Sequence, residues 1–554
     1  MSVRRALAGA VVALVTGTLV APINSAHGAT AKDRGTGIGT KAALDGPNCD
    51  PSTGKVAVPQ TFVALCVRPF PEGGNNGGAT ARGVTATTVK VVGVIPNAEQ
   101  EGAFRARGAL PRDAATGGPG TWEQAFRDMA APFERFFEQW GRTVEWDFYT
   151  STGSDEAAQR ADAIAIIDRE PFAAMVVPGG TVLQTELAAG KVLVLGSGTN
   201  TEAREQSPYR WGAFATDTAA AGVNTGEFVA KSLAGRTAQW AGESLRTKTR
   251  TIVAVYPAPE PRLDFRIEYF DDAFRQYAKR GVPRPASVQY TNAANLTAAS
   301  AEYQAQAPQI VAQLKQANAT TVVLFCTTDL ARELVKVATT QDFYPEWVVT
   351  AYALLDVNIL ARTVDQEQWA HAFGIGGQLP PVVKSTPEPN FGIYGWYWGQ
   401  QQGTITPLLQ GYMSFLYNGL QMAGPRLTAK TYHAGMFAMP STGGAAQDKV
   451  NSFEIAFGAT ADLPYDEYLA IGLDATLVWW SGDTPLPANA SGAIAFPGTG
   501  TYLYVNGAKR YHSGSWPTSL PKFFDAASST AALDPLPAAD VPPDYPCDGC
   551  PSAT

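Results

Sequence analysis

Two short apolar runs separated by one helical segment constrain the fold of this chain most. Within residues 171–200, the runs Ala173–Val177 and Val192–Leu195 each end abruptly in small polar residues, and Val182–Ala189 between them has the pattern of a helix. Uninterrupted apolar runs of this length are typical of strands buried on both faces. Two such strands joined through a helix predict a parallel βαβ unit, whose ligand crevice lies at the carboxyl ends of the strands.

The same alternation of strand and helix continues on both sides of this unit. Further strands are expected at Val89–Ile95, Val144–Tyr149, Thr251–Tyr256, Val288–Thr291, Thr321–Cys326 and Trp347–Thr350. Helices are expected at Asp155–Glu170, Thr218–Leu233, Leu263–Arg280, Ala301–Ala317 and Leu330–Thr340, and an amphipathic, aromatic helix is expected to begin at Trp122. Strands that alternate with helices predict an α/β fold with mostly parallel sheets. Because the series occurs twice, we expect two lobes with a cleft between them.

From about residue 366 the pattern changes. A strand is expected at His371–Gly376, an aromatic stretch covers 394–398, and Thr406–Ala423 has the pattern of a helix. Gly498–Ser513 is predicted to be a hairpin that turns at Asn506-Gly507. Residues 98–120 are predicted to be a long loop because they are polar and rich in glycine.

The N-terminal 28 residues have the features of an export signal. Arg4 and Arg5 precede the uncharged apolar run Ala6–Ala21, and small residues flank a cleavage site after Gly28. The run is shorter than the roughly 20 residues of a membrane-spanning helix. We therefore expect an exported protein, located outside the cell or in its envelope. Since no cysteine follows the apolar run, a lipid anchor is not expected.

Charge and cysteine usage exclude several classes of protein. The formal net charge is −8, whereas nucleic-acid-binding proteins present a clustered positive field. Two close cysteine pairs fit disulfides formed in an oxidising compartment, Cys49 with Cys66 and Cys547 with Cys550. Cys326 lies in an apolar run and is predicted to be a buried thiol. The pairs are distant from each other and from the histidines, so neither a metal site nor a cofactor is expected.

The small polar residues after the two central strands are the first candidates for ligand binding. They are Gly180, Thr181, Ser197, Gly198 and Thr199. Glycine lets backbone N–H groups approach a ligand closely, and the hydroxyls add donors and acceptors. Trp122 begins the aromatic helix near the same crevice. Core packing and ligand contact are equally weighted roles for its side chain.

Several segments occur in an order that is known from one family. They are GVTATTVKVVGVI (83–95), VVPGG…VLVLGSGTN (176–200), Tyr209–Ala215 with Asp217, VVLFCTTDLARELVKVA (322–338), LVWWSGD (477–483) and GTGTYLYVNGAKRYHSGSWP (498–517). This order resembles that of the type I periplasmic binding proteins of ABC importers, in particular the branched-chain amino acid group and its actinobacterial relatives. The resemblance covers about residues 83–520 and rests on the ordered series. It implies two lobes that are joined by three crossovers and close on a small ligand.

The resemblance also implies roles for individual residues. Ser197, Gly198 and Thr199 would hold a ligand carboxylate, Gly180 and Thr181 would form a hydroxyl loop of the first lobe, and Thr327, Thr328, Asp329 and Tyr352 would close on the ligand from the second lobe. The family's acidic residue that pairs with a ligand ammonium has no match at Tyr352-Ala353. Asp329 and Asp356 are the candidates to replace it, with a helix N-cap and a surface carboxylate as their alternative roles. An amino acid, amide, aromatic or carboxylate ligand therefore remains open.

Domain boundaries and partners follow from the same resemblance. The expected parts are a signal (1–28), an extension or linker (29–83), a first lobe (84–215 and 366–490), a second lobe (216–365 and 491–523) and a tail (524–554). The expected partners of a monomeric protein are a small ligand and a membrane-embedded ABC permease.

Binding is favoured over catalysis. The sequence has neither a G-x-S-x-G elbow nor a phosphate loop, and His371, His433 and His512 are scattered. We therefore expect an exported solute-binding protein for ABC-type uptake and no enzyme. The alternatives are a secreted sensory or scavenging receptor domain without a transporter and, less favoured, a secreted hydrolase.

Overall fold

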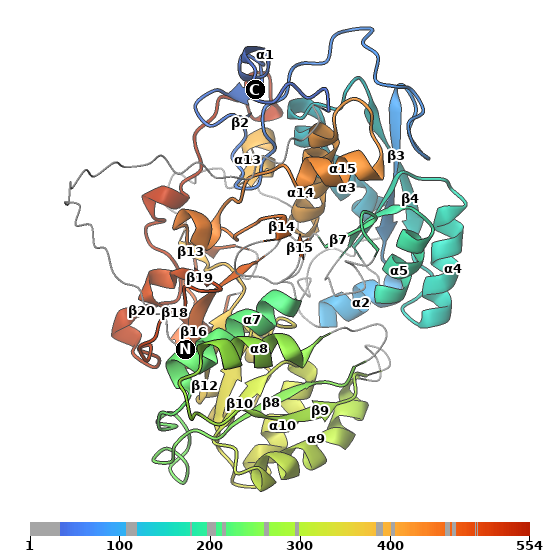
Figure 1. Cartoon of the computed structure of the whole chain (residues 1–554). Helices are drawn as coiled ribbons and strands as arrows, with labels where there is room; N and C mark the ends of the chain where they lie inside the picture. Colours follow the sequence, from blue (N-terminus) through green and yellow to red (C-terminus); the bar gives the residue numbers. More distant parts are fainter. Residues whose placement is uncertain are drawn as a thin grey trace, which may run out of the picture.

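The computed structural model describes residues 34–106, 119–177, 180–196, 206–212, 218–259, 265–293, 299–383, 392–399, 405–459, 466–467, 472–492, 495 and 497–553. The chain forms two α/β lobes, the first built on a five-stranded sheet and the second on a nine-stranded sheet (Figure 1). The mixed α/β class with parallel sheets flanked by helices, which the sequence predicted, is confirmed.

The first-lobe sheet is parallel throughout. Its order is β4 (Thr143–Thr150), β3 (Thr88–Ile95), β5 (Ala173–Val176), β6 (Leu193–Gly196) and β7 (Arg210–Gly212). Every residue of β5 and β6 is buried, and α5 (Thr181–Ala189) connects the two strands. The predicted βαβ unit is therefore present.

Helices cover both faces of this sheet. On one face α3 (Pro119–Phe136), α13 (Gly392–Trp398), α14 (Thr406–Ala423) and α15 (Ala429–Met436) pack against Val91 and Met175. On the other face α4 (Glu156–Ile167) and α5 pack against Val92 and Ala174. Successive strand residues thus enter opposite cores, as the two-residue period of a strand requires.

The second-lobe sheet is mixed. Its parallel part runs β9 (Ala286–Tyr290), β8 (Ile252–Pro257), β10 (Thr321–Leu324), β11 (Glu346–Val349) and β12 (Ala372–Gly376), and β16 (Asp474–Pro485), β18 (Thr499–Val505) and β20 (Ser529–Thr530) continue it antiparallel. The helices α9 (Ala299–Gln316) and α10 (Thr328–Thr340) pack on one face, whereas α7 (Thr218–Phe228), the π-helix η1 (Val229–Leu233) and α8 (Ile267–Tyr277) pack on the other.

The lobe boundaries differ from those predicted. Strands β12 and β16 were expected in the first lobe, but β12 pairs with β11 and β16 pairs with β12 in the second-lobe sheet. Their apolar residues need a sheet that is covered on both faces, which the second lobe provides. The intervening helices α13, α14 and α15 return to the first-lobe core. The chain therefore passes between the lobes after β7, after β12 and before β16.

The hairpin predicted for Gly498–Ser513 is wrong. Both β18 and β19 (Arg510–His512) pair with β16 and run in the same direction along it. Asn506, Gly507 and Ala508 have φ values of 55°, 64° and 62°. Three successive left-handed residues form a bulge, after which the chain continues along the same partner strand.

The three stretches expected to lack regular structure are ordered where the structure describes them. Residues 98–106 form α2 (Ala98–Ala106) in place of a loop. The extension joins the first-lobe core through Val56, Phe62 and Val63, and a disulfide links Cys49 to Cys66. The tail adds β20 to the second-lobe sheet and carries the Cys547–Cys550 disulfide. These segments have apolar residues spaced too sparsely to predict a strand or helix, but enough of them to dock on a finished core.

Candidate functional site

The carboxyl ends of the first-lobe strands carry a polar rim. The helix α2, which follows β3, lies on the side of this lobe that faces α7 and α8 of the second lobe (Figure 1). Asn97 and Gln100 cap the start of α2 reciprocally, with N···O distances of 2.9 and 3.0 Å. The Gln100 amide also donates to Ser151 Oγ at 3.0 Å. The ends of β3 and β4 are thereby joined.

A buried carboxylate fixes the loop after β4. Asp162 of α4 accepts hydrogen bonds from Tyr149 Oη (2.8 Å), Ser151 Oγ (2.9 Å) and Thr152 Oγ1 (2.6 Å). Burial and this carboxylate raise the pKa of Tyr149 to about 12, so the phenol remains a donor. The network is self-contained and gives the rim a rigid base.

Gly180 and Thr181 stand at the end of β5, as predicted. Gly180 is the N-cap of α5, and a Cβ at this position would lie 2.5 Å from Gln159 Oε1. That oxygen accepts from Leu183 N at 3.2 Å, so Gln159 cannot retreat without losing a contact. Thr181, half-buried, begins the helix. Ser197, Gly198 and Thr199 lie outside the described residues.

Trp122 has the core position that was one of its two expected roles. Its side chain is fully buried in the first-lobe core, and its Nε1 donates to Glu101 Oε2 at 3.4 Å. Glu101 in turn pairs with Arg105 at 2.6 Å. The sequence did not indicate this acid and base of α2, because it predicted a loop there. A contact of Trp122 with a ligand remains a prediction.

In the second lobe, the end of β10 leads into the start of α10. Thr327 is the N-cap, and its Oγ1 accepts from Leu330 N at 3.5 Å. Thr328 is only 7% exposed, and its Oγ1 has no hydrogen-bond partner among the described residues. Asp329 lies in the first turn and pairs with Arg332 at 3.1 Å. The N-cap role considered for Asp329 therefore belongs to Thr327.

The neighbouring strand end carries an aromatic loop. The Tyr352 ring packs on Phe265 and Phe325, with centroid distances of 5.1 and 6.5 Å. Ala353 and Leu354 follow with φ values of 52° and 63°, and the Leu354 side chain is 47% exposed. Two successive left-handed residues other than glycine are strained, and such strain concentrates at functional sites. Sequence reasoning identified Tyr352 but not Leu354, whose backbone conformation leaves no mark in the sequence.

Asp356 is not the surface carboxylate that was its alternative role. It is 3% exposed, and its Oδ2 accepts from Gln378 N at 2.9 Å. Burial raises its pKa to about 6, against the lowering effect of backbone N–H groups and Arg510. Gln378 belongs to the segment that leaves β12 for the first lobe. Asp356 thus lies beneath a crossover and is directed at its backbone.

The raised pKa of Asp356 predicts a pH dependence of stability. The folded state retains a proton up to about pH 6, whereas the unfolded chain releases it near pH 3.8, so stability should fall as pH rises through this interval. Asp356→Asn should remove this fall. A difference of two pKa units corresponds to about 3 kcal/mol, so between pH 4 and pH 7 the free energy of unfolding of the variant should rise by about that much relative to the native chain. Urea unfolding at a series of pH values measures it. The control is Asp483→Asn, at an exposed position. If the free energies of unfolding of the native chain and of Asp356→Asn change in parallel with pH, the prediction is refuted.

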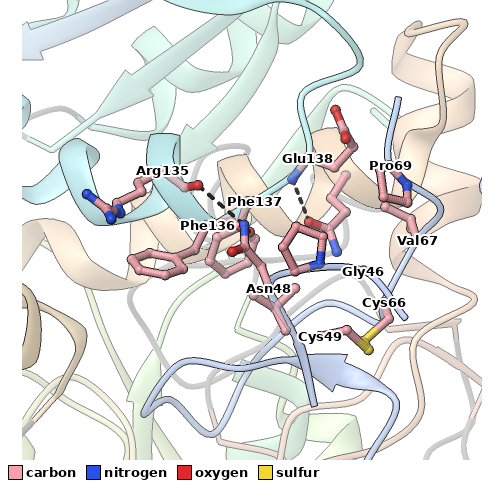
Figure 2. A pocket seen from close by; sticks show the side chains of 13 residues that line it. Gly46, Asn48, Cys49, Cys66, Val67, Pro69, Arg135, Phe136, Phe137 and Glu138 are labelled. Carbon is pink, nitrogen blue, oxygen red and sulfur yellow. Dashed lines mark hydrogen bonds between the residues drawn. A yellow bond between two sulfur atoms is a disulfide. The ribbon is translucent and has the colours of Figure 1, made fainter. Parts of the chain in front are cut away.

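Two cavities that open to the surface lie away from these strand ends. One, of about 180 Å³, lies between the extension and the end of α3. Figure 2 shows the Cys49–Cys66 disulfide beside it and Asn48 directed at the α3 carbonyls, with 3.1 Å from Nδ2 to Phe136 O. The other, of about 410 Å³, lies at the amino ends of the first-lobe strands. Among the predicted ligand-binding residues that the structure describes, none lines either cavity.

Two of the histidines contact oxygen atoms of neighbouring residues, and the free cysteine is buried. Within the described ranges, no three His, Cys, Asp or Glu side chains are grouped as metal ligands. His371 Nδ1 lies 2.6 Å from Trp240 O, and His512 Nδ1 lies 3.0 Å from Glu454 Oε2. Cys326 is fully buried as predicted, and burial raises the pKa of its thiol.

A separate question is whether the chain crosses a membrane. Among the helices that the structure describes, none combines the length and the hydropathy that a membrane span requires.

Similar solved structures are type I solute-binding proteins. A solute-binding protein of an ABC transporter from R. palustris, in complex with 4-hydroxybenzoate, is 11% identical over 77% of this chain and 97% of that one, with a TM-score of 0.44. A fatty acid ABC transporter substrate-binding protein from Thermomonospora curvata is 13% identical (78% and 95%, TM-score 0.44). A branched-chain amino acid transporter substrate-binding protein from Streptococcus pneumoniae, in complex with isoleucine, is 11% identical (76% and 100%, TM-score 0.39).

The solved structures named here are solute-binding proteins of transporters, and the kind of protein predicted from the sequence is taken up below as a proposal. The narrower actinobacterial resemblance stays a prediction. No protein-family model matches the sequence, and no curated protein matches it. At such identities and scores, neither a ligand nor a transporter is transferred to this chain.

Proposed function

We propose that this chain is an exported solute-binding protein that captures a small polar molecule between its lobes by hinge closure and delivers it to an ABC-type importer. The observation that carries the proposal is the polar rim at the carboxyl ends of the parallel strands, where open α/β sheets bind ligands. Gly180 and Thr181 stand at this position in the first lobe. Thr328, whose hydroxyl has no partner within the described part of the chain, stands at it in the second. A ligand that bonds to both lobes would favour the closed arrangement through its differential affinity.

The acidic residues of the second lobe bear on the class of ligand. An α-amino acid needs a carboxylate for its ammonium group, and Asp329 and Asp356 were the two candidates. Asp329 is already paired with Arg332. Asp356 is only 3% exposed, with Oδ2 bonded to Gln378 N and Oδ1 buried without a partner among the described residues, so neither oxygen is open to a ligand from the cleft. Neither supports an ammonium contact. The exposed Leu354 adds an apolar surface to the same rim. We therefore favour a carboxylate or amide with an apolar body and no ammonium group.

Matched ligand pairs test this proposal by calorimetry. Each pair joins an α-amino acid to the acid that lacks its amino group, for example phenylalanine with 3-phenylpropanoate and leucine with 4-methylpentanoate, together with the corresponding amides. The deaminated member should bind more tightly. Thr328→Val keeps the side-chain shape and removes the hydroxyl, so it should weaken binding roughly tenfold, about 1.4 kcal/mol.

The control is Thr340→Val at the exposed end of the same helix, where the lost bond is to Val337 O. This variant should bind as the native chain does. Tighter binding of the amino acids would overturn the ligand class. Failure of every ligand to bind, or turnover of one of them, would overturn the binding function itself.

The importer partnership needs a separate experiment. Uptake of the labelled ligand should be lost in cells that lack this chain and restored by the native protein, whereas Thr328→Val should need about ten times more ligand for the same uptake. Unchanged uptake in cells without the chain would favour the receptor that works without a transporter.

A further inference from the structure

The larger cavity opens at the end of the first lobe opposite the proposed ligand site. Phe172 immediately precedes β5, Lys191 precedes β6 by two residues, and Tyr209 immediately precedes β7. The remaining side chains used below are Arg82 of the extension and Lys430 in the first turn of α15. The cavity has a volume of about 410 Å³, within the range of about 300–1,000 Å³ that is usual for small-molecule sites.

The lining of this cavity is cationic. Arg82, Lys191 and Lys430 contribute three positive charges, and none of the Asp and Glu residues that the structure describes lines the cavity. The ammonium of Lys191 lies over the Tyr209 ring, 5.0 Å from its centroid, at a backbone position with φ of 63°. The ring and the backbone thus set the direction of the lysine side chain.

Arg82 provides the second observation. Its Nη2 donates to Gly190 O at 2.6 Å, while its Nε is inaccessible to solvent and has no hydrogen-bond partner among the described residues. A buried guanidinium N–H without an acceptor is uncommon in folded proteins. The Arg82 side chain as a whole is only partly buried and lines the cavity, so its guanidinium adds a positive charge to the cavity wall. The neighbouring cations favour a negatively charged acceptor.

We propose that this cavity binds a phosphate-type oxyanion group, separate from the ligand between the lobes. Guanidinium and ammonium donors converge on such groups in proteins. The cavity has room for more than the ion, and Phe172 and Tyr209 provide apolar walls for an attached body. Free inorganic phosphate and the phosphate group of a larger molecule share this chemistry.

Calorimetry on the full chain at low ionic strength tests the proposal with inorganic phosphate and glycerol 3-phosphate as probes. Binding should weaken as sodium chloride is added. Lys191→Asn with Lys430→Gln should weaken it at least tenfold, because asparagine tolerates the left-handed backbone and both lysines are exposed. Arg82→Gln should weaken it as well. The matched control is Lys248→Gln with Lys279→Gln, an equal charge change at exposed second-lobe positions.

Each outcome decides between alternatives. Binding that the control leaves intact supports the site, and the tighter probe identifies the free ion or the larger phosphate ester as its occupant. No binding of either probe overturns it, as does an equal loss in both double variants, since only net charge would then matter. Neither probe belongs to the carboxylate and amide panel, so the result is independent of the proposed function.

Discussion

Replacing Arg510 by methionine should lower the free energy of unfolding by about 3–5 kcal/mol, because it leaves a buried carboxylate without its partner. Arg510 and Asp474 pair through two contacts, Nε to Oδ2 at 2.8 Å and Nη2 to Oδ1 at 2.9 Å. Neither side chain is accessible to solvent. Methionine keeps much of the apolar stem of arginine. The decrease in the free energy of unfolding would therefore come from removal of the guanidinium group.

The position of this pair gives it a role beyond stability. Asp474 also accepts from Ala445 N (2.8 Å) and Glu454 N (3.1 Å), which belong to the segment before β16. Arg510 donates to Gly377 O at 3.2 Å, in the segment after β12. One ion pair therefore fastens two of the three passages between the lobes. Its loss should make the arrangement of the lobes less defined.

Urea unfolding followed by tryptophan fluorescence measures the effect. The control is Arg275→Met, which breaks the exposed pair with Asp272 and should change stability by at most about 0.5 kcal/mol. A double-mutant cycle with Asp474→Asn isolates the interaction, and the two changes should be strongly non-additive. If Arg510→Met and Arg275→Met lower the free energy of unfolding equally, the buried pair stabilises the protein no more than the exposed pair does.

The sequence predicted the parallel cores well and the connections between them poorly. Strands β5 and β6 are uninterrupted apolar runs. Such a run can be identified as a strand from its own residues, without knowing which strands pair with it. Strand β12 has the same kind of pattern, yet its lobe depends on whether it pairs with β11, which no local pattern specifies. The Asp474–Arg510 pair joins residues 36 positions apart through the pairing of β16 with β19. Neither residue stands out in the sequence.

The candidate site divides in the same way. Thr181 was predicted from its place after a strand and Thr328 from the family resemblance; both lie at strand ends, and their contact with a ligand stays a prediction. The roles of Asp329 and Asp356 could not be predicted, because each depends on one neighbour. Asp329 pairs with Arg332 one turn along the helix. Asp356 accepts a hydrogen bond from Gln378, which lies in a distant crossover. The pKa of a carboxyl group is set by its burial and its partners, and only the folded chain defines both.

The segment predicted to be a tail, residues 524–554, connects the two lobes. We define the strap as residues 529–553. At its start it pairs with β18, and Leu533 is buried in the second-lobe core. At its end Tyr545 Oη donates to Asp50 Oδ2 at 2.9 Å, Trp396 Nε1 donates to Tyr545 O at 2.8 Å, and Arg135 Nη1 donates to Gly549 O at 2.8 Å. Figure 1 shows the C-terminus beside α1 (Lys41–Leu44) and far from β20.

Removal of residues 537–554 should therefore broaden the range of separations between the lobes. Arg135 Nη2 also donates to Asp548 O, and Ser552 Oγ donates to Trp396 O, so five hydrogen bonds attach the end of the strap to the first lobe. At about 1 kcal/mol each they give about 5 kcal/mol, which corresponds to a population ratio of a few thousand. States that require the strap to detach would thus be rare in the full chain and common in the shortened one. The cut leaves β20 and Leu533 in place, so the second-lobe core should be retained.

Distances between spin labels measure this effect. Ile164 on α4 is 63% exposed and Gln309 on α9 is also exposed, so cysteines at these positions place one label on each lobe. The native cysteines do not interfere, since four are in disulfides and Cys326 is buried. Tyr545→Phe removes only the bond to Asp50 and should give an intermediate width. Superimposable distributions for the full and shortened chains would show that the strap follows the lobes without restraining them, and the hinge would then be governed by the three crossovers alone.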